Sequence, residues 1–306
     1  MRNFAISSVA CAAFLAGHSQ AALLISESFN YGTGAISGTT TGGSGLTGTY
    51  SAGGVNANGS NATFNVSASS LSFAGHFAAS GGSLTVANAG GNYGEAAASA
   101  QISASLAGNT KVFSSSLERL NTAGQYFNDW TVEQRFNSAV LGNYQSSGGR
   151  NEVSAFGSGS ASARRAGASM DASEVTDASK TLAAGTTYLL VTAYTLSGSN
   201  LTSATMYAFD QASYANYLTA ANAAPANAEA LLSSNALFSI TDTANFAVSN
   251  VKYLQFSIGG GPSGQFDDYR LGTAVTDVVN VATPEPASLA ILGCSASLIV
   301  MRRRRR

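Results

Sequence analysis

Apolar and polar residues alternate with a period of two along much of this chain. Between residues 23 and 31, Leu23, Ile25, Glu27 and Phe29 fall on one side, while the residues between them fall on the other. This alternation is typical of a half-buried β-strand. Similar short runs, bounded by Gly, Asn or Ser, occur at residues 46–50, 62–66, 71–77, 83–86, 95–103, 111–120, 126–136 and 152–156. Their spacing predicts an all-β fold, an antiparallel β-sandwich.

The second half of the sequence has the strongest strand pattern. Residues 187–196 are aromatic and β-branched without a charge, which predicts a central strand buried on both faces, paired with residues 203–209. The polar segment between residues 156 and 184 is expected to be a loop with one short strand. Residues 246–258 and 265–271 are predicted strands joined by a glycine-rich turn.

Two segments depart from this pattern. Residues 211–234 are rich in alanine, with Tyr214, Tyr217 and Leu218 at helical spacing and Pro225 at a favourable helix start, so one or two short helices are expected. Residues 32–59 are dominated by Gly, Thr and Ser, which predicts turns that contribute little to the core.

Both ends of the chain carry segments that are expected to lie outside the sandwich. Arg2, the apolar run that follows it and the small residue Ala21 predict a secretory signal peptide over residues 1–21, cleaved after Ala21. The two cysteines, Cys11 and Cys294, both fall in end segments, so disulfides and thiolate metal sites are excluded from the mature domain. A lipoprotein signal at Cys11 is disfavoured because the usual leucine three positions before the cysteine is missing.

The charge of the central part bears on its partners. Residues 22–283 contain fifteen acidic and nine basic side chains, a net charge of −6, and no basic cluster. Nucleic acid is therefore not an expected partner. A neutral, hydroxyl-rich surface of this kind suits a polysaccharide environment.

The C-terminal tail has three features in a fixed order. Pro284, Glu285 and Pro286 precede fifteen uncharged residues, 287–301, which as a helix would span roughly 22 Å. The basic residues Arg302, Arg303, Arg304, Arg305 and Arg306 end the chain. A helix of this length is short for a hydrocarbon core of about 30 Å, and the arginines would stay with the cytoplasmic headgroups.

This order resembles the PEP-CTERM sorting signal. The resemblance implies processing at Pro284, Glu285 and Pro286 by an exosortase-type protease, a transient stay in the inner membrane, and export in bacteria that make exopolysaccharide. The alternatives are an ordinary tail anchor or a core helix with a basic end, although a core helix has no use for five consecutive arginines.

A second resemblance concerns the fold. Residues 27–31, 187–209, 254–258 and 266–272 look like the first, central and last strands of concanavalin A-like (laminin-G-like) jelly-roll domains that carry PEP-CTERM tails. It implies that the strand at Glu27 lies beside the strand at Asp267. The expected organisation is a signal peptide (1–21), a β-sandwich extracellular domain (22–275), a linker (276–283) and a sorting signal (284–306) with a transmembrane helix at 287–301.

Candidate chemistry is sparse. His76 is the single histidine of the mature chain and is expected on the polar or edge side of a short strand, without partners for catalysis. Trp130 with Asp129 and Glu133 is a candidate glycan contact. Their predicted strand has a short helix capped at Asn128 as its alternative. Asp267 and Asp268 are weak candidates for calcium, since adjacent strand residues face opposite ways and one of them is expected in solvent. No other cofactor is implied.

We therefore expect a non-enzymatic protein of the cell surface or extracellular matrix, structural or adhesive in exopolysaccharide, with weak glycan binding. One alternative is a divergent glycoside hydrolase or polysaccharide lyase that uses Asp129 and Glu133. The other alternative is a simple membrane-anchored ectodomain.

Overall fold

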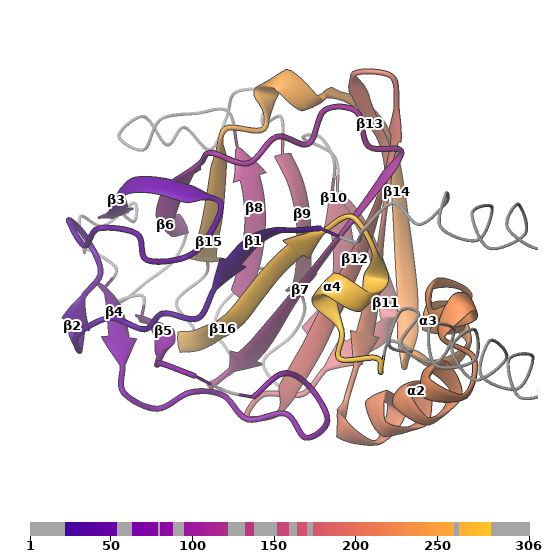
Figure 1. The fold of residues 1–306 in the computed structure, drawn as a ribbon. Helices are drawn as coiled ribbons and strands as arrows, with labels where there is room; N and C mark the ends of the chain where they lie inside the picture. Colours follow the sequence, from indigo (N-terminus) through magenta and orange to yellow (C-terminus); the bar gives the residue numbers. More distant parts are fainter. Residues whose placement is uncertain are drawn as a thin grey trace, which may run out of the picture.

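The computed structural model describes residues 22–53, 63–78, 80–87, 95–121, 132–137, 152–158, 164–169, 174–259 and 263–282. They form a mostly antiparallel β structure with few helices, in which two sheets face one another (Figure 1). Within these ranges no helix is long and apolar enough to cross a membrane. The expected signal peptide and the tail from Pro284 to Arg306 lie outside the described residues.

The larger sheet contains the first and the last strand of the domain. Its order is β14-β13-β12-β7-β16-β5-β4-β2, and β1 also pairs with β16. The strands are β1 (Leu23–Glu27), β2 (Gly34–Ala35), β4 (Thr63–Ser67), β5 (Ser83–Ala87), β7 (Lys111–Leu120), β12 (Thr187–Ser197), β13 (Asn200–Phe209), β14 (Phe238–Ala247) and β16 (Ser263–Gly272). Glu27 is opposite Tyr269 in the β1–β16 pair, which confirms the expected proximity of the two terminal strands.

The smaller sheet has the order β11-β10-β9-β8-β15-β6-β3. Its strands are β3 (Leu46–Gly53), β6 (Glu95–Ile102), β8 (Val132–Asn137), β9 (Glu152–Ser158), β10 (Arg164–Ser169), β11 (Glu174–Leu182) and β15 (Tyr253–Gly259). β15 and β16 are neighbours in sequence but belong to different sheets. The short segment between them therefore carries the chain from one sheet to the other.

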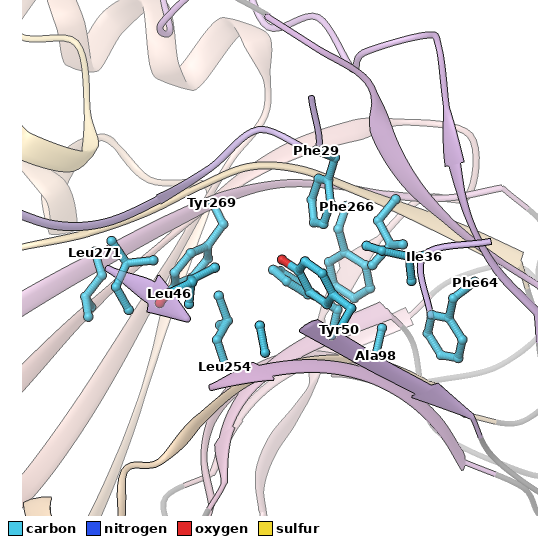
Figure 2. Close-up of a cluster of buried hydrophobic side chains, with 14 of the residues drawn as sticks. Phe29, Ile36, Leu46, Tyr50, Phe64, Ala98, Leu254, Phe266, Tyr269 and Leu271 are labelled. Carbon is cyan, nitrogen blue, oxygen red and sulfur yellow. The ribbon is translucent and has the colours of Figure 1, made fainter. Parts of the chain in front are cut away.

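The main core fills the space between the sheets with aromatic rings (Figure 2). Phe256 of the smaller sheet packs against Phe266 of the larger one with ring centroids 5.0 Å apart, and Phe29 meets Phe256 edge-on at 5.2 Å. Each fully buried ring of this kind stabilises the fold by about 1.5–3 kcal/mol. Ile36 and Tyr50 also lie in this core, so the prediction that residues 32–59 contribute little to it is wrong.

The helices cover part of the outer face of the larger sheet. α2 (Gln211–Ala223), the 3-10 turn η1 (Pro225–Asn227) and α3 (Ala228–Asn235) follow β13 and confirm the helical prediction for this region. Tyr214, Tyr217 and Leu232 pack on Leu189 and Val191 of β12, together with the short helix α4 (Val275–Val278). β12 is thus covered on both faces, as predicted for a central strand.

Three expectations about elements are wrong. Residues 71–77 form a turn-rich loop, because Gly75 adopts a φ of +83° that a strand does not accommodate. The polar stretch before Ala184 contains two strands, β10 and β11, instead of one. Residues 246–258 are not one strand but the end of β14, the 3-10 turn η2 (Val248–Asn250) and β15.

The packed part of the chain also extends further than expected. Val278, Val279 and Val281 are buried, although residues 276–283 were expected to be a linker.

Candidate functional site

The pairing of β1 with β16 brings the buried acidic residues of the two strands toward the same region. Glu27 ends β1 on the inward side of the alternation, with 1% of its surface exposed. Asp267 and Asp268 sit at an irregularity in the pairing of β16 with β7. Asp268 has a φ of +43°, a left-handed conformation that is uncommon outside glycine. Both aspartates are buried, so the expectation that one of them faces solvent is wrong.

Glu27 is held by neutral donors. Its Oε1 accepts from the backbone amide of Phe29 at 2.6 Å, and its Oε2 accepts from the hydroxyls of Tyr31 at 2.6 Å and Tyr50 at 2.9 Å. Burial raises the pKa of Glu27, and these hydrogen bonds offset part of the rise. The pKa of each tyrosine is raised as well, first by burial and then by the nearby Glu27.

The backbone conformation of Phe29 contributes to the binding of Glu27. Its φ of +50° bends the backbone directly after β1, so that its own amide points back at Glu27 while its ring enters the core. A non-glycine residue in this region is strained by about 1–2 kcal/mol, which the surrounding contacts must offset.

Asp267 is bound by backbone amides. Its Oδ2 accepts from Leu71 at 2.7 Å and its Oδ1 from Asp268 at 2.7 Å. Burial raises the pKa of Asp267 to about 7, with further upward contributions from the charges of Asp268 and Glu27. The carboxylate thus joins the loop after β4 to the last strand.

Asp268 lies between two basic side chains. Its Oδ2 is 3.2 Å from His76 Nε2, and its Oδ1 accepts from Arg270 Nε at 3.1 Å. Burial alone would raise the pKa of Asp268, but His76 and Arg270 outweigh it and lower the pKa. The Arg270 guanidinium also lies 3.5 Å from the centre of the Phe77 ring.

His76 links this cluster to the helices. Its Nδ1 is 3.3 Å from the hydroxyl of Tyr214 in α2, and that hydroxyl already accepts from the amide of Asn280. The direction of the hydrogen bond between Tyr214 and Nδ1 depends on which ring nitrogen carries the hydrogen, and Nε2 faces Asp268. The prediction that His76 lies on the polar or edge side of a strand is wrong, because its side chain is fully buried in a loop.

Burial limits the proton transfer that Tyr214, His76 and Asp268 could support. A histidine between a tyrosine and a carboxylate has the composition of a proton relay, but here both ring nitrogens face protein groups and the ring has no exposed surface. The cluster connects β16, the loop around Gly75 and α2, so its polar contacts hold these three parts of the fold together.

The structure describes both calcium candidates, Asp267 and Asp268, but only one of the three glycan candidates, Glu133. Asp267 and Asp268 direct their carboxylates at protein donors, and across the described ranges no three His, Cys, Asp or Glu side chains converge as a metal site would require. Glu133 lies in β8, opposite Ser257 and Phe156. Asp129 and Trp130 lie outside the described residues.

The His76–Asp268 contact was missed at the level of sequence. The two residues are far apart in the chain, and nothing in the spacing around either one indicates a pair. The buried position of Glu27, in contrast, follows directly from the alternation in β1.

No family model matches the chain, and no curated protein matches it. The solved structures to which the chain is similar include the following three. The globular domain of T. cruzi calreticulin has a TM-score of 0.47 at 8% identity, over 93% of this chain and 100% of that one. The endo-β-1,4-glucuronan lyase of the fungus Trichoderma reesei has a TM-score of 0.41 at 11% identity, over 72% and 91%. The lectin UEA-II, complexed with galactose, has a TM-score of 0.37 at 11% identity, over 62% and 86%. At these scores the likenesses carry no argument about activity or ligand.

Proposed function

We propose that this protein is exported and sorted by a C-terminal PEP-CTERM signal, and that it serves as a non-enzymatic component of the cell surface or extracellular polysaccharide matrix. The observation that carries this proposal is the order of features in the tail: Pro284, Glu285 and Pro286, then the uncharged segment 287–301, then Arg302 to Arg306. The tail stays transiently in the inner membrane until an exosortase-type protease processes it. The role in the matrix is structural or adhesive, with weak glycan binding.

The folded part supports this proposal in two ways. Two facing antiparallel sheets with paired terminal strands suit a concanavalin A-like jelly roll, a compact ectodomain that needs no disulfide. In addition, the buried carboxylates Glu27, Asp267 and Asp268 are each engaged by protein donors, as expected for structural residues.

The intact mass of the protein recovered from the extracellular fraction tests the proposal. We expect a chain that begins at Ala22 and lacks Arg302 to Arg306, with any attached sugar visible as added mass. Released material that still carries the arginines would contradict processing at the motif.

A substitution series separates sorting from simple anchoring. Replacing Pro284, Glu285 and Pro286 together by alanine should leave the protein in the membrane fraction, because the processing protease loses its motif. A matched control, Ser288→Ala in the uncharged segment, should be released like the wild type. Equal retention of both variants in the membrane fraction would favour a plain membrane-anchored ectodomain.

A further inference from the structure

The last described residues form a strap on the outside of the larger sheet, which we define as residues 275–282 and which comprises α4 and the four residues after it (Figure 1). Val275, Val278, Val279 and Val281 are buried in the core beneath the helices. The Ser115 hydroxyl donates to the Val278 carbonyl at 2.6 Å, and the Asn280 side chain donates to the Gly75 carbonyl at 3.2 Å. The strap is therefore fastened along its whole length.

Its final contact joins the strap to the end of α2. The amide of Ala282 donates to Asn222 Oδ1 at 2.8 Å, and Asn222 lies in the last turn of α2. An extended chain advances at most about 3.6 Å per residue, so Glu285 lies within about 11 Å of Ala282 and Ala287 within about 18 Å. This limit holds for any conformation of the tail. If residues 287–301 enter the membrane, the membrane surface therefore comes close to the end of α2.

The surface at this end of the molecule is unusual for an acidic domain. No residue of α2 is charged, and neither are those of η1, while residues 22–282 as a whole carry a net charge of −6. The exposed side chains of α2 are short and neutral: Gln211, Ala212, Ala215, Asn216, Thr219, Asn222 and Ala223. Electrostatic interactions in physiological salt fade over about 8 Å, so the charges nearest a membrane dominate its repulsion. The exposed face of α2 therefore carries no negative charge of its own for an anionic surface to repel, and the nearest acid on α3, Glu229, is paired with Lys111.

We propose that the exposed face of α2 lies against the anionic lipid headgroups of the membrane while the tail is still attached. This inference rests on the proposed function, because it takes residues 287–301 as the membrane segment. The short reach from Ala282 places this face near the lipid, and its lack of charge allows it to approach without electrostatic repulsion. With small polar side chains it touches the headgroups and does not enter the hydrocarbon.

Site-specific quenching tests the orientation. The full chain with Cys11→Ser and Cys294→Ser receives one cysteine, either Ala223→Cys at the end of α2 or Ser199→Cys as the matched control. Both positions are exposed, and Ser199 lies in the turn before β13, at the opposite end of that strand from α2 (Figure 1). Each variant is labelled with a fluorophore and reconstituted into phosphatidylglycerol-containing vesicles with a headgroup-attached quencher. We expect severalfold stronger quenching at position 223 than at position 199.

The outcomes distinguish this inference from the proposed function. Equal quenching at both positions in vesicle-bound protein would overturn the orientation and leave the membrane segment intact. Failure of the chain to bind vesicles would overturn the proposed function, and the orientation with it. A second variant, Ala215→Glu on the exposed face of α2, should reduce quenching at position 223, whereas Ser203→Glu on the sheet should not. An unchanged signal with Ala215→Glu would also count against the proposal.

Discussion

Glu27 and Asp267 are buried carboxylates that accept hydrogen bonds from neutral groups, whereas Asp268 is paired with His76 and Arg270. Burial of a charge without a cationic partner disfavours the ionised form, while a nearby cation favours it. The pKa is accordingly raised for Glu27 and Asp267 and lowered for Asp268. Acids in one small region therefore contribute to stability in opposite directions as pH changes.

Asp267 should make the domain more stable at mildly acidic pH. Its pKa rises from 3.8 in the unfolded chain to about 7 in the fold, so between these values the folded state binds more protons. Its contribution to stability therefore grows as pH falls through this window and is lost as pH rises toward 7. Relative to Asp267→Asn, the unfolding free energy of the wild type should rise by roughly 1–3 kcal/mol from pH 8 to pH 5, as measured by urea titration.

Asp268→Asn is the matched control for this titration. Because the pKa of Asp268 is lowered below 3.8, its contribution is present throughout that window and disappears only at more acidic pH. The difference between wild type and Asp268→Asn should change much less from pH 8 to pH 5, by no more than the part of the Asp267 pKa shift that the charge of Asp268 causes. A constant difference between wild type and Asp267→Asn would contradict the assignment.

Substitutions of Glu27 measure how much its hydrogen bonds with Phe29, Tyr31 and Tyr50 contribute to stability. Glu27→Ala removes the acceptor for Phe29, Tyr31 and Tyr50 and should lower the unfolding free energy by roughly 2–4 kcal/mol. Glu27→Gln keeps the shape and removes the cost of burying a charge, so its loss should be clearly smaller. Chemical denaturation at neutral pH compares the two. A larger loss for the glutamine variant would show that the negative charge itself is required.

At the scale of elements, two glycines offer a sharp comparison, Gly45 directly before β3 and Gly48 within it. Gly45 and Gly48 both have positive φ, of 74° and 80°. A Cβ at Gly45 would lie 1.9 Å from the carbonyl oxygen of Leu24 in β1, whereas one at Gly48 would have no neighbour within 4 Å. Gly48→Ala should cost about 1–2 kcal/mol of backbone strain. Gly45→Ala should cost several kcal/mol more, because β1 must shift, and a similar melting temperature for both variants would refute this.

The start of α2 depends on one side chain. Asp210 precedes the helix and its Oδ1 accepts from the Ser213 amide at 2.8 Å. Asp210→Ala should destabilise the domain by about 1 kcal/mol, and Asp210→Asn, which keeps a capping oxygen, by much less. Thermal unfolding followed by circular dichroism measures both. Equal losses would mean that the cap contributes little.

Most strands could be predicted because one face of each is buried, which leaves a period of two in the sequence. β14 was missed because its polar residues Thr241, Asp242 and Thr243 hide the alternation, although Asp242 is buried. The loop around Gly75 was predicted as a strand from its apolar residues Leu71 and Phe73, which are buried without belonging to a sheet. Contacts between distant segments, such as that of His76 with Asp268, leave no local pattern.

At the scale of the whole molecule, the tail bears on where the protein is sorted, whereas the fold shows how the domain is arranged. The sorting signal that we propose at residues 284–306 rests on the local sequence alone. The strap could not be foreseen, since the burial of Val278 and Val281 depends on helices some sixty residues earlier in the chain. The structure therefore adds one fact that the tail sequence does not contain: the tail leaves the domain beside the end of α2.

The pairing of β1 with β16 also determines when the domain can be completed. The strand that is synthesised first needs the strand that is synthesised last, and Glu27 and Asp267 are buried only once both are in place. A ribosome must pass Gly272 before the larger sheet can close. Native contacts between such distant positions make folding slow. Newly made chains therefore remain open to chaperones and proteases until β16 has emerged.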